Sequence, residues 1–330
     1  MPQRELAPLP PKEFPHSPSE LQEFAEGYEL TTPIHKSNVS TVYAAKDPNI
    51  PGFVAVKFSV LTGRLENEVR SGELTEDSPY VIDYYDHAID EDRSLGYVVT
   101  PYTFLDMGSK HAVFQSENDK LATLRDVARG LLDLHGEGLV HRDVKPRNVF
   151  LSENLLGGRG RNQYSAFLGD LGIVCENGYT RDLAVEDTQD VLPSPDITQA
   201  GNMILPIGWA APEQYDRQKT LTTKVDAFSF GLLISRTLLG VNPFSVALGY
   251  HHPGMSILSD QEKITDAQKQ ALESVAIKVD DFSKHIPKAS LDECGLDLAD
   301  ILRRCLSADP DVRPDAEELS YVLEKETQSL

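Results

Sequence analysis

The sequence predicts an α+β protein with two lobes, a small β-rich lobe followed by a larger α-helical lobe. At 330 residues the chain exceeds the usual domain length of about 100–200 residues. Up to residue 102, runs of β-branched and aromatic residues alternate with turn-forming residues. Beyond it, hydrophobic residues recur at the helical period of about 3.6 residues. These observations place an N-lobe at about residues 28–102 and a C-lobe at about residues 103–325.

The N-lobe is expected to hold four strands and a short helix. Val39–Ala44 and Phe53–Phe58 are strand-like, with the turn-forming residues KDPNIPG between them. Val81–Tyr85 and Tyr97–Tyr102 form a second pair of strands, joined by the polar residues IDEDRS. The helix is expected between the two pairs, over Arg64–Leu74, where a glycine weakens its pattern.

The C-lobe is expected to be built from helices. Hydrophobic residues of segment 124–134 fall on one helical face, and Asp226–Leu239 is apolar nearly all round, as in a helix at the centre of a lobe. Leu298–Leu306 and Ala316–Leu323 are amphipathic helices that close the chain. At the other end, residues 1–20 contain six prolines, which predicts a disordered extension before the folded part at 21–325.

Composition excludes several classes of protein. The formal net charge is −21, which argues against general nucleic-acid binding because so acidic a chain repels phosphate backbones. The three cysteines are widely spaced and fit neither a disulfide framework nor a metal site. The N-terminus lacks a signal-peptide core, and the most apolar stretch, Phe228–Leu239, is too short to span a bilayer. The sequence therefore predicts a soluble cytoplasmic or nuclear protein without membrane insertion.

The most specific segment is VHRDVKPRNVFL, at Val140–Leu151, whose spacing matches the catalytic loop of protein kinases. An acceptor hydroxyl needs a nearby carboxylate to orient it and take its proton, and Asp143 is the candidate for that catalytic role. Lys145 is the second catalytic candidate, because its ammonium can neutralise charge on a transferred phosphoryl group. Asn148 follows the aspartate by five positions, where its amide oxygen can ligate a divalent metal.

The chain resembles a eukaryotic-type protein kinase over about residues 28–322, because further motifs follow in that family's order. Val54–Lys57 resembles the strand whose lysine binds the α- and β-phosphates of ATP. Leu168–Gly172 resembles the family's DFG segment with leucine in place of phenylalanine. The resemblance therefore implies that Asp170 coordinates Mg²⁺. It implies a bilobal kinase-like fold, ATP and Mg²⁺ as cofactors, and a protein substrate as partner.

The resemblance also predicts the partners of these residues in the nucleotide site. Glu68 is the favoured partner of Lys57, with Glu66 and Glu73 as alternatives on the same predicted helix. Contacts to the adenine are implied for residues of the strands and of the segment that joins the lobes, namely Val42, Ala55, Thr100, Tyr102 and Phe150. Outside this site, Glu213 of an APE motif is expected to form a buried structural ion pair with Arg313.

One departure from the family concerns the loop that covers the phosphates. Its three glycine positions are His35, Ser37 and Ser40, although backbone amides there must approach the phosphates closely. Two interpretations follow, an active kinase with an altered loop and a pseudokinase scaffold or allosteric regulator that binds nucleotide weakly. The active kinase is favoured because all four principal site residues remain, namely Lys57, Asp143, Asn148 and Asp170.

The acceptor class is less specified by the sequence. Lys145 followed by proline resembles serine/threonine kinases, whereas Pro206 with Trp209 resembles the tyrosine-kinase substrate platform. Because Lys145 contacts the reaction itself, serine/threonine specificity is favoured, with tyrosine or dual specificity as the alternative. A kinase of small molecules is disfavoured, because the APE segment and Arg313 build a platform for protein substrates. Arg147 lies where arginine-directed kinases carry an acidic residue. Because its guanidinium repels basic side chains, the sequence predicts a substrate without arginine upstream of the acceptor.

Two further predictions concern positions outside the motifs. Arg236, like Arg147, lies where an acidic residue would favour arginine upstream of the acceptor. The segment 173–208 is polar and long, and an upstream kinase is expected to phosphorylate it at Thr188 or Thr198. Arg142, beside the catalytic aspartate, is the expected contact of that phosphate.

Overall fold

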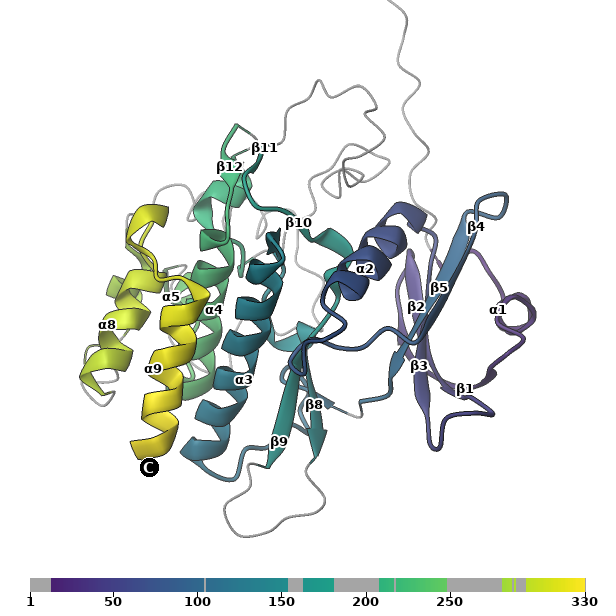
Figure 1. Ribbon diagram of the computed structural model, residues 1–330, viewed down its shortest axis with the longest axis horizontal. Coiled ribbons are helices and arrows are strands. Elements are labelled where there is room, and N and C mark those ends of the chain that lie inside the picture. The colour runs from purple at the N-terminus through teal and green to yellow at the C-terminus, as the bar shows by residue number, and fades with distance from the viewer. Residues whose placement is uncertain are drawn as a thin grey trace, which may run out of the picture.

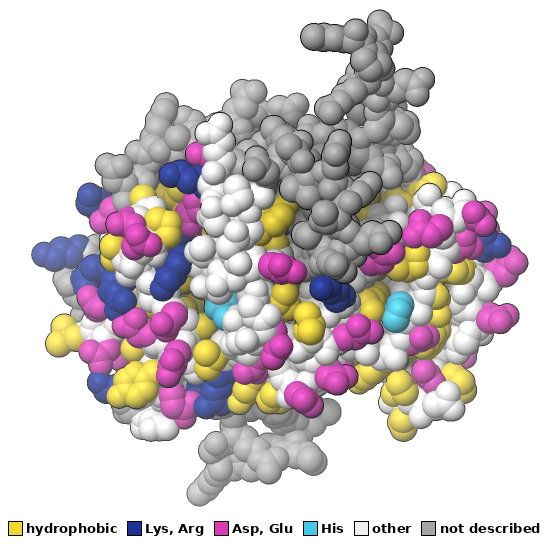
Figure 2. All heavy atoms as spheres, turned by 45° about the horizontal axis from the view of Figure 1, so that its top comes forward, with side chains coloured by type: hydrophobic (Ala, Val, Ile, Leu, Met, Phe, Trp, Pro, Cys, Tyr) yellow, Lys and Arg dark blue, Asp and Glu magenta, His cyan; other side chains and the backbone are white. Residues whose placement is uncertain are grey.

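The computed structural model describes residues 13–103, 105–153, 163–180, 208–216, 218–247, 281–286, 288 and 295–329. A sheet-rich N-terminal lobe lies beside a helical C-terminal lobe, which confirms the predicted fold class (Figure 1). The face turned forward in Figure 2 carries acidic side chains over both lobes, in keeping with the net charge of −21. Within the described residues, no helix combines the length and apolar character that crossing a membrane requires.

The N-lobe is a five-stranded antiparallel sheet, with helix α2 against the face that carries Lys57. The strands lie in the order β1-β2-β3-β5-β4 and span β1 Glu29–Lys36, β2 Ser40–Lys46, β3 Val54–Ser59, β4 Asp86–Asp90 and β5 Leu95–Pro101. α2 spans Thr62–Leu74 and packs through Leu65 and Val69 against Val98 of β5. This arrangement brings the helix to the same face of the sheet as Lys57, whose cross-strand partner is Val98.

The side chains of β3 alternate between two environments, as the period of two in a strand requires. Val54, Val56 and Phe58 point into the hydrophobic cluster on the outer face of the sheet. Ala55 and Lys57, between them, lie on the opposite face, toward the C-lobe. The alternation therefore presents the lysine to the space between the lobes.

The N-terminal segment is not disordered throughout, as the sequence predicted. Helix α1 (Pro18–Phe24) begins before residue 20 and covers the outer face of the sheet (Figure 1). Phe14 and Leu21 are buried there. Proline suits the first turn of a helix, and Ser17 with Glu20 forms a capping box, so Pro18, one of the prolines that suggested disorder, instead begins a helix. Residues 1–12 lie outside the described residues.

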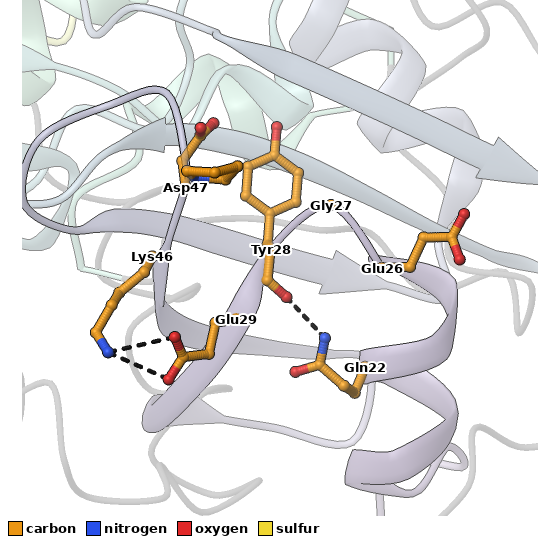
Figure 3. Close-up of a pocket in the computed structure, with 8 residues that line it drawn as sticks. Gln22, Glu26, Gly27, Tyr28, Glu29, Lys46 and Asp47 are labelled. Carbon is orange, nitrogen blue, oxygen red and sulfur yellow. Dashed lines mark hydrogen bonds and ion pairs between the residues drawn. The ribbon is translucent and has the colours of Figure 1, made fainter.

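A side-chain contact joins α1 to the first strand. Gln22 donates from Nε2 to the carbonyl of Tyr28 at 2.7 Å and accepts from the amide of Leu30 at 2.9 Å. These bonds border a cavity of about 520 Å³ between α1 and the β1–β2 hairpin, with the exposed Lys46–Glu29 ion pair at its edge (Figure 3). The helix is thus tied to the sheet by polar as well as apolar contacts.

Leu21→Ala is expected to lower the free energy of unfolding by about 2–5 kcal/mol, because the side chain fills a buried position in the outer cluster. Chemical denaturation measures the change. Glu23→Ala, at an exposed position of the same helix, is the control and should change stability by less than about 0.5 kcal/mol. Equal, small effects of both variants would show that α1 contributes nothing to the lobe.

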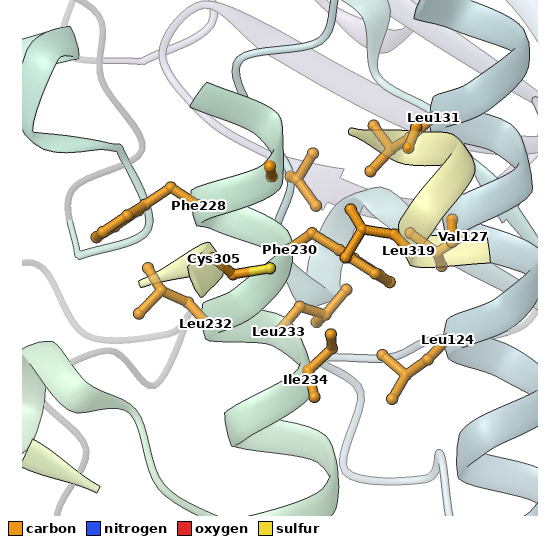
Figure 4. Packing of buried hydrophobic residues seen from close by; sticks show 14 of the residues in the cluster. Leu124, Val127, Leu131, Phe228, Phe230, Leu232, Leu233, Ile234, Cys305 and Leu319 are labelled. Carbon is orange, nitrogen blue, oxygen red and sulfur yellow. The ribbon is translucent and has the colours of Figure 1, made fainter. Parts of the chain in front are cut away.

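The C-lobe is organised around α4, which is buried along most of its length. Phe230 and Leu233 of α4 meet Leu124 and Val127 of α3 and Leu319 of α9 in one cluster (Figure 4). The helices of this lobe span α3 Glu117–Gly136, α4 Lys224–Leu239, α5 Pro243–Ala247, α8 Leu296–Cys305 and α9 Ala316–Ser329. The four helices predicted in this lobe therefore correspond to α3, α4, α8 and α9.

The C-lobe also contains short strands. They span β6 Leu105–Asp106, β7 Leu139–Val140, β8 Val149–Glu153, β9 Tyr164–Leu168, β10 Cys175–Glu176, β11 Tyr179–Thr180 and β12 Thr220–Leu221. β6, β8 and β9 form one small sheet, while β7 pairs with β10 and β11 with β12. One-turn 3₁₀ helices lie between them at Pro146–Asn148, Leu171–Ile173 and Pro212–Tyr215, and others at Phe282–His285 and Pro310–Val312.

The strand predicted at Val81–Tyr85 is wrong, because β4 begins at Asp86 instead. Val81 forms an isolated bridge to Leu168, and the amide of Ile82 donates to the carbonyl of Leu168 at 2.9 Å. Val81 and Ile82 are buried because this end of the run packs against the C-lobe, where Val81 clusters with Leu134 and Leu139, and not because it belongs to the N-lobe sheet. An apolar run of this length is compatible with either environment.

Candidate active site

Lys57 lies between two carboxylates that come from different parts of the fold. Its Nζ atom is 2.9 Å from Oε2 of Glu68 on α2 and 2.7 Å from Oδ1 of Asp170, which follows β9. Glu66 and Glu73, the alternatives on the same helix, are exposed. The side chain of Glu68 is only 5% exposed, whereas that of Asp170 is 40% exposed and can receive a ligand from the cleft.

The electrostatics of this group follow from two carboxylates sharing one ammonium. Burial opposes the charge of Lys57, but Asp170 and Glu68 outweigh it and hold the lysine pKa above its ordinary value. Burial also acts against the charged form of Asp170, but the Lys57 ammonium prevails and lowers that carboxyl pKa. For Glu68, burial prevails over Lys57 and raises the carboxyl pKa. Lys57 and Asp170 are therefore both charged at neutral pH.

The catalytic-loop residues surround Asp143. Lys145 donates from Nζ to Oδ2 of Asp143 at 2.9 Å, and Asn148 donates from Nδ2 to the Asp143 carbonyl at 2.9 Å. Among the described residues, no hydrogen-bond partner reaches the buried Oδ1 atom of Asp143. An unpartnered carboxylate oxygen is the group that an incoming hydroxyl needs.

Asp226, on the central helix α4, holds the backbone of this loop. Its carboxylate accepts from the amides of His141 and Arg142 at 2.7 Å each, and lies 2.9 Å from Nε2 of His135. Arg142 has φ of 69°, in the left-handed region that side chains other than glycine rarely adopt. The buried aspartate thus fixes a strained turn directly before Asp143, as often occurs at functional sites.

His141 connects the catalytic loop to the segment that carries Asp170. Its Nδ1 atom accepts from the amide of Asp143 at 3.2 Å, which assigns the proton to Nε2, and Nε2 lies 3.1 Å from the carbonyl of Gly169. Burial raises the pKa of Asp170, and the cations of Lys57 and then of Lys145 lower it. Asp143 and Asp170 therefore belong to one site.

The residues expected near adenine share one face of the N-lobe sheet or lie below it. Ala55 and Thr100 are direct cross-strand partners, and Val42 pairs with the residue two positions after Ala55, so the three occupy one face. Phe150 comes from β8 in the C-lobe and is half-buried. Tyr102 follows β5, and its ring packs at 6.1 Å from that of Phe53. The role of these residues in binding adenine remains a prediction.

Asn148 and Asp170 have the donor atoms that Mg²⁺ prefers. The amide nitrogen of Asn148 is used by the Asp143 carbonyl, which leaves its oxygen as a ligand, and Lys57 occupies one oxygen of Asp170. No group of three or more His, Cys, Asp or Glu side chains that could hold a metal exists in the described residues.

The ion pair predicted between Glu213 and Arg313 is present and buried. The two side chains form a bidentate pair at 2.5 and 3.0 Å, and the arginine side chain is fully buried. The next residue, Gln214, donates from Nε2 to the carbonyl of Arg142 at 3.1 Å. The pair therefore stabilises a segment that contacts the backbone beside Asp143.

Several predictions about the substrate side fall only partly on described residues. Pro206, Thr188 and Thr198 lie outside them. Trp209 is buried, and its carbonyl accepts from Ser229 of α4 at 2.8 Å. Arg236 donates to the carbonyl of Gly240 at 3.3 Å, at the end of α4.

Sequence reasoning missed two residues that position Glu68 and its helix. Tyr84 donates from its hydroxyl to Oε1 of Glu68 at 3.3 Å, and its ring occupies the space beside Gly72, where a Cβ atom would lie 2.2 Å from the ring. Asn67 donates from Nδ2 to the carbonyl of Val174 at 2.9 Å, linking α2 to the segment after Asp170. The only available signal was Gly72, whose presence inside a helix indicates a close approach.

Comparison with known proteins agrees with this geometry. The protein kinase domain model matches residues 28–322. The chain is 32% identical over 200 residues to the serine/threonine-protein kinase/endoribonuclease IRE1a of Arabidopsis thaliana, covering 60% of this chain and 18% of that protein. It is 26% identical over 236 residues to the serine/threonine-protein kinase PknJ of Mycobacterium tuberculosis, covering 68% and 36%. It is 28% identical over 200 residues to the serine/threonine/tyrosine-protein kinase HT1 of Arabidopsis thaliana, covering 61% and 38%.

The chain thus spans less than two-fifths of the length of each of these three relatives. The kinase match, by contrast, includes both lobes and every residue of the site from Lys57 to Arg313. With the lysine, the two aspartates and the APE ion pair in place, the chain belongs to the protein kinase family.

Proposed function

We propose that this protein is an ATP-dependent serine/threonine protein kinase with Asp143 as its catalytic base. The observation that carries the proposal is the pairing of Lys57 with both Glu68 and Asp170, next to an Asp143 carboxylate with one unpartnered oxygen. In kinases the lysine–glutamate pair and the metal-binding aspartate must both be in place for phosphoryl transfer.

In the proposed reaction the acceptor hydroxyl donates its proton to Asp143 while its oxygen forms a bond to the γ-phosphorus of ATP. The bond from that phosphorus to the oxygen bridging the β-phosphate breaks, and ADP leaves with the electron pair. Lys57 binds the phosphates, Lys145 neutralises charge on the transferred group, and Asn148 and Asp170 hold Mg²⁺. When bound, Mg²⁺ neutralises negative charge that develops on the phosphates.

Serine/threonine specificity rests on Lys145, whose ammonium already contacts the catalytic carboxylate at 2.9 Å. The names of IRE1a and PknJ include serine/threonine kinase, and that of HT1 adds tyrosine, which keeps dual specificity as the alternative. Phosphoamino-acid analysis of labelled substrate distinguishes the two acceptor classes.

The proposal is tested by incubating the purified protein with γ-labelled ATP, Mg²⁺ and generic protein substrates. Label is expected on serine or threonine, and Lys57→Met should abolish its transfer. Lys46→Met is the matched control, because Lys46 is an exposed lysine paired with Glu29 at the opposite end of the sheet from α2. Absence of transfer, together with absence of nucleotide-induced thermal stabilisation, would identify a scaffold instead.

The acid side of the pH profile provides a second test. Above the Glu68 pKa the Lys57–Glu68 pair is intact, and it is lost as pH falls through that raised pKa. Tyr84→Phe removes a donor to the charged carboxylate, so it should raise the Glu68 pKa further and start the acid-side loss of kcat/KM at higher pH. Tyr85→Phe, at the exposed neighbouring position, should leave the profile unchanged. If the acidic limb of the pH profile does not move, protonation of Glu68 is not the cause of the loss of kcat/KM at low pH.

Substrate charge provides a third test. Arg147 lies in the 3₁₀ turn that follows Lys145, so its cation should disfavour arginine and favour acidic or phosphorylated side chains upstream of the acceptor. A peptide array is expected to show this preference, and Arg147→Ala to weaken it. A preference for upstream arginine in the parent protein would refute the assignment.

A further inference from the structure

The turn between β1 and β2 is closed by one of its own side chains. The hydroxyl oxygen of Ser37 accepts from the backbone amides of Val39 at 3.3 Å and Ser40 at 3.0 Å. The amide of Ser37 donates to the carbonyl of Ser40 at 2.8 Å, and the Ser37 hydroxyl reaches the same carbonyl at 3.1 Å. The amides of Ser37, Val39 and Ser40 are therefore hydrogen-bonded within the turn without any ligand.

These amides lie at the edge of the site described above. The carbonyl of Val39 accepts from the amide of Val60 at 3.0 Å, which fixes the turn at the end of β3 that follows Lys57. On the strand just before the turn, His35 pairs with Val42, and Val42 in turn pairs with Lys57. The hairpin therefore lies alongside the strand that carries Lys57.

The backbone of the turn has no conformation that requires glycine. Every φ in residues 37–40 is negative. Among the described non-glycine residues, positive φ occurs at Ser94, Arg142 and Asp170. The turn thus reaches its shape through a side-chain hydrogen bond, where a glycine-rich loop would keep its amides open for a phosphate.

We propose that the Ser37 hydroxyl is a built-in occupant of the two amides that would otherwise bind the phosphates of ATP. The inference rests on the proposed ATP-binding function and concerns how strongly this site holds the triphosphate. For a phosphate oxygen to reach the amides of Val39 and Ser40, the hydroxyl must first be displaced. Ser37 therefore weakens the phosphate-dependent part of nucleotide affinity and leaves the adenine-dependent part unchanged.

Removing the hydroxyl should expose this effect directly. Ser37→Ala frees both amides, and alanine accepts the negative φ of the turn without strain. Charged acceptors form stronger hydrogen bonds than a neutral hydroxyl does, so the freed amides should favour a phosphate oxygen. The expected gain in affinity for Mg²⁺·ATP is about fivefold, the size of one net hydrogen bond.

The experiment measures binding of Mg²⁺·ATP and of adenosine by calorimetry to the parent protein, Ser37→Ala and Ser37→Gly. Both variants should bind Mg²⁺·ATP more tightly and adenosine within about twofold of the parent. Thr31→Ala is the control, because its hydroxyl belongs to the same hairpin but donates to the carbonyl of Ala44 and contacts no turn amide. The control should leave the ratio of the two affinities unchanged.

Weaker or unchanged binding of Mg²⁺·ATP by Ser37→Ala would overturn the inference, because the hydroxyl would then be a ligand of the phosphate or irrelevant to it. Equal gains for ATP and adenosine would overturn it as well. If neither the parent nor either Ser37 variant bound Mg²⁺·ATP, it would also fall. A selective gain without any phosphoryl transfer would leave the inference standing while the proposed enzymatic function failed.

Discussion

Asp143→Asn is expected to lower kcat by about 10²–10⁴-fold, the usual contribution of a general base. The amide keeps the shape of the side chain and can still contact Lys145, but it cannot take the proton of the acceptor hydroxyl. The loss should appear in kcat, because Asp143 is assigned no contact with the nucleotide. Initial rates with labelled ATP, measured at saturating protein substrate, give the value.

Two companion measurements make this result specific. The affinity for Mg²⁺·ATP and the free energy of unfolding should remain close to those of the parent protein, and Asp92→Asn at an exposed position should leave kcat unchanged. A fall in kcat of less than about tenfold would contradict the assignment of Asp143 as base.

Arg313→Met is expected to lower the free energy of unfolding by about 3–5 kcal/mol, the cost of breaking a buried ion pair on one side. The arginine side chain is fully buried, and its loss leaves the Glu213 carboxylate without a cation. The carbonyls of Ser307 and Lys224, both 2.9 Å from the guanidinium, also lose their donor. Urea denaturation followed by circular dichroism measures the change.

A half-exposed ion pair of the same lobe is the matched control. Arg304 forms a bidentate contact with Glu318, and their side chains are 34% and 40% exposed, so Arg304→Met should cost only about 0–1 kcal/mol. Combining Arg313→Met with Glu213→Gln should cost less than the sum of the single changes, because the unpaired buried charge is removed. Additive costs would show that the pair is not coupled.

Two of the site residues, Asp143 and Asn148, could be related to each other from sequence because only five positions separate them, whereas Lys57 and Asp170 were assigned through their motifs. Asp143 and Asn148 share one loop, so their side chains meet wherever that loop folds. The partner of Lys57 could not be chosen in the same way. Only the rotation of α2 decides which of three glutamates faces inward, and that rotation depends on packing against β5.

Other features depended on contacts between distant segments and were not predictable from local patterns. The hydroxyl of Tyr84 meets Glu68 because the run after Val81 packs against the C-lobe and not within the sheet. The sequence shows that Ser37 replaces a glycine, but not that its hydroxyl accepts hydrogen bonds from the turn amides. Helix α1 was hidden by prolines, although Ser17 and Glu20 formed a recognisable start signal.

The central claim is that one cleft binds ATP between Lys57 and Asp143 and holds a metal through Asn148 and Asp170. The most direct test is a crystal structure of the protein with Mg²⁺ and a non-hydrolysable ATP analogue. The account predicts a triphosphate contacting Lys57 and metal density next to Asn148 and Asp170, with the terminal phosphate facing Asp143. A nucleotide bound elsewhere, or a cleft with neither nucleotide nor metal under saturating conditions, would contradict it.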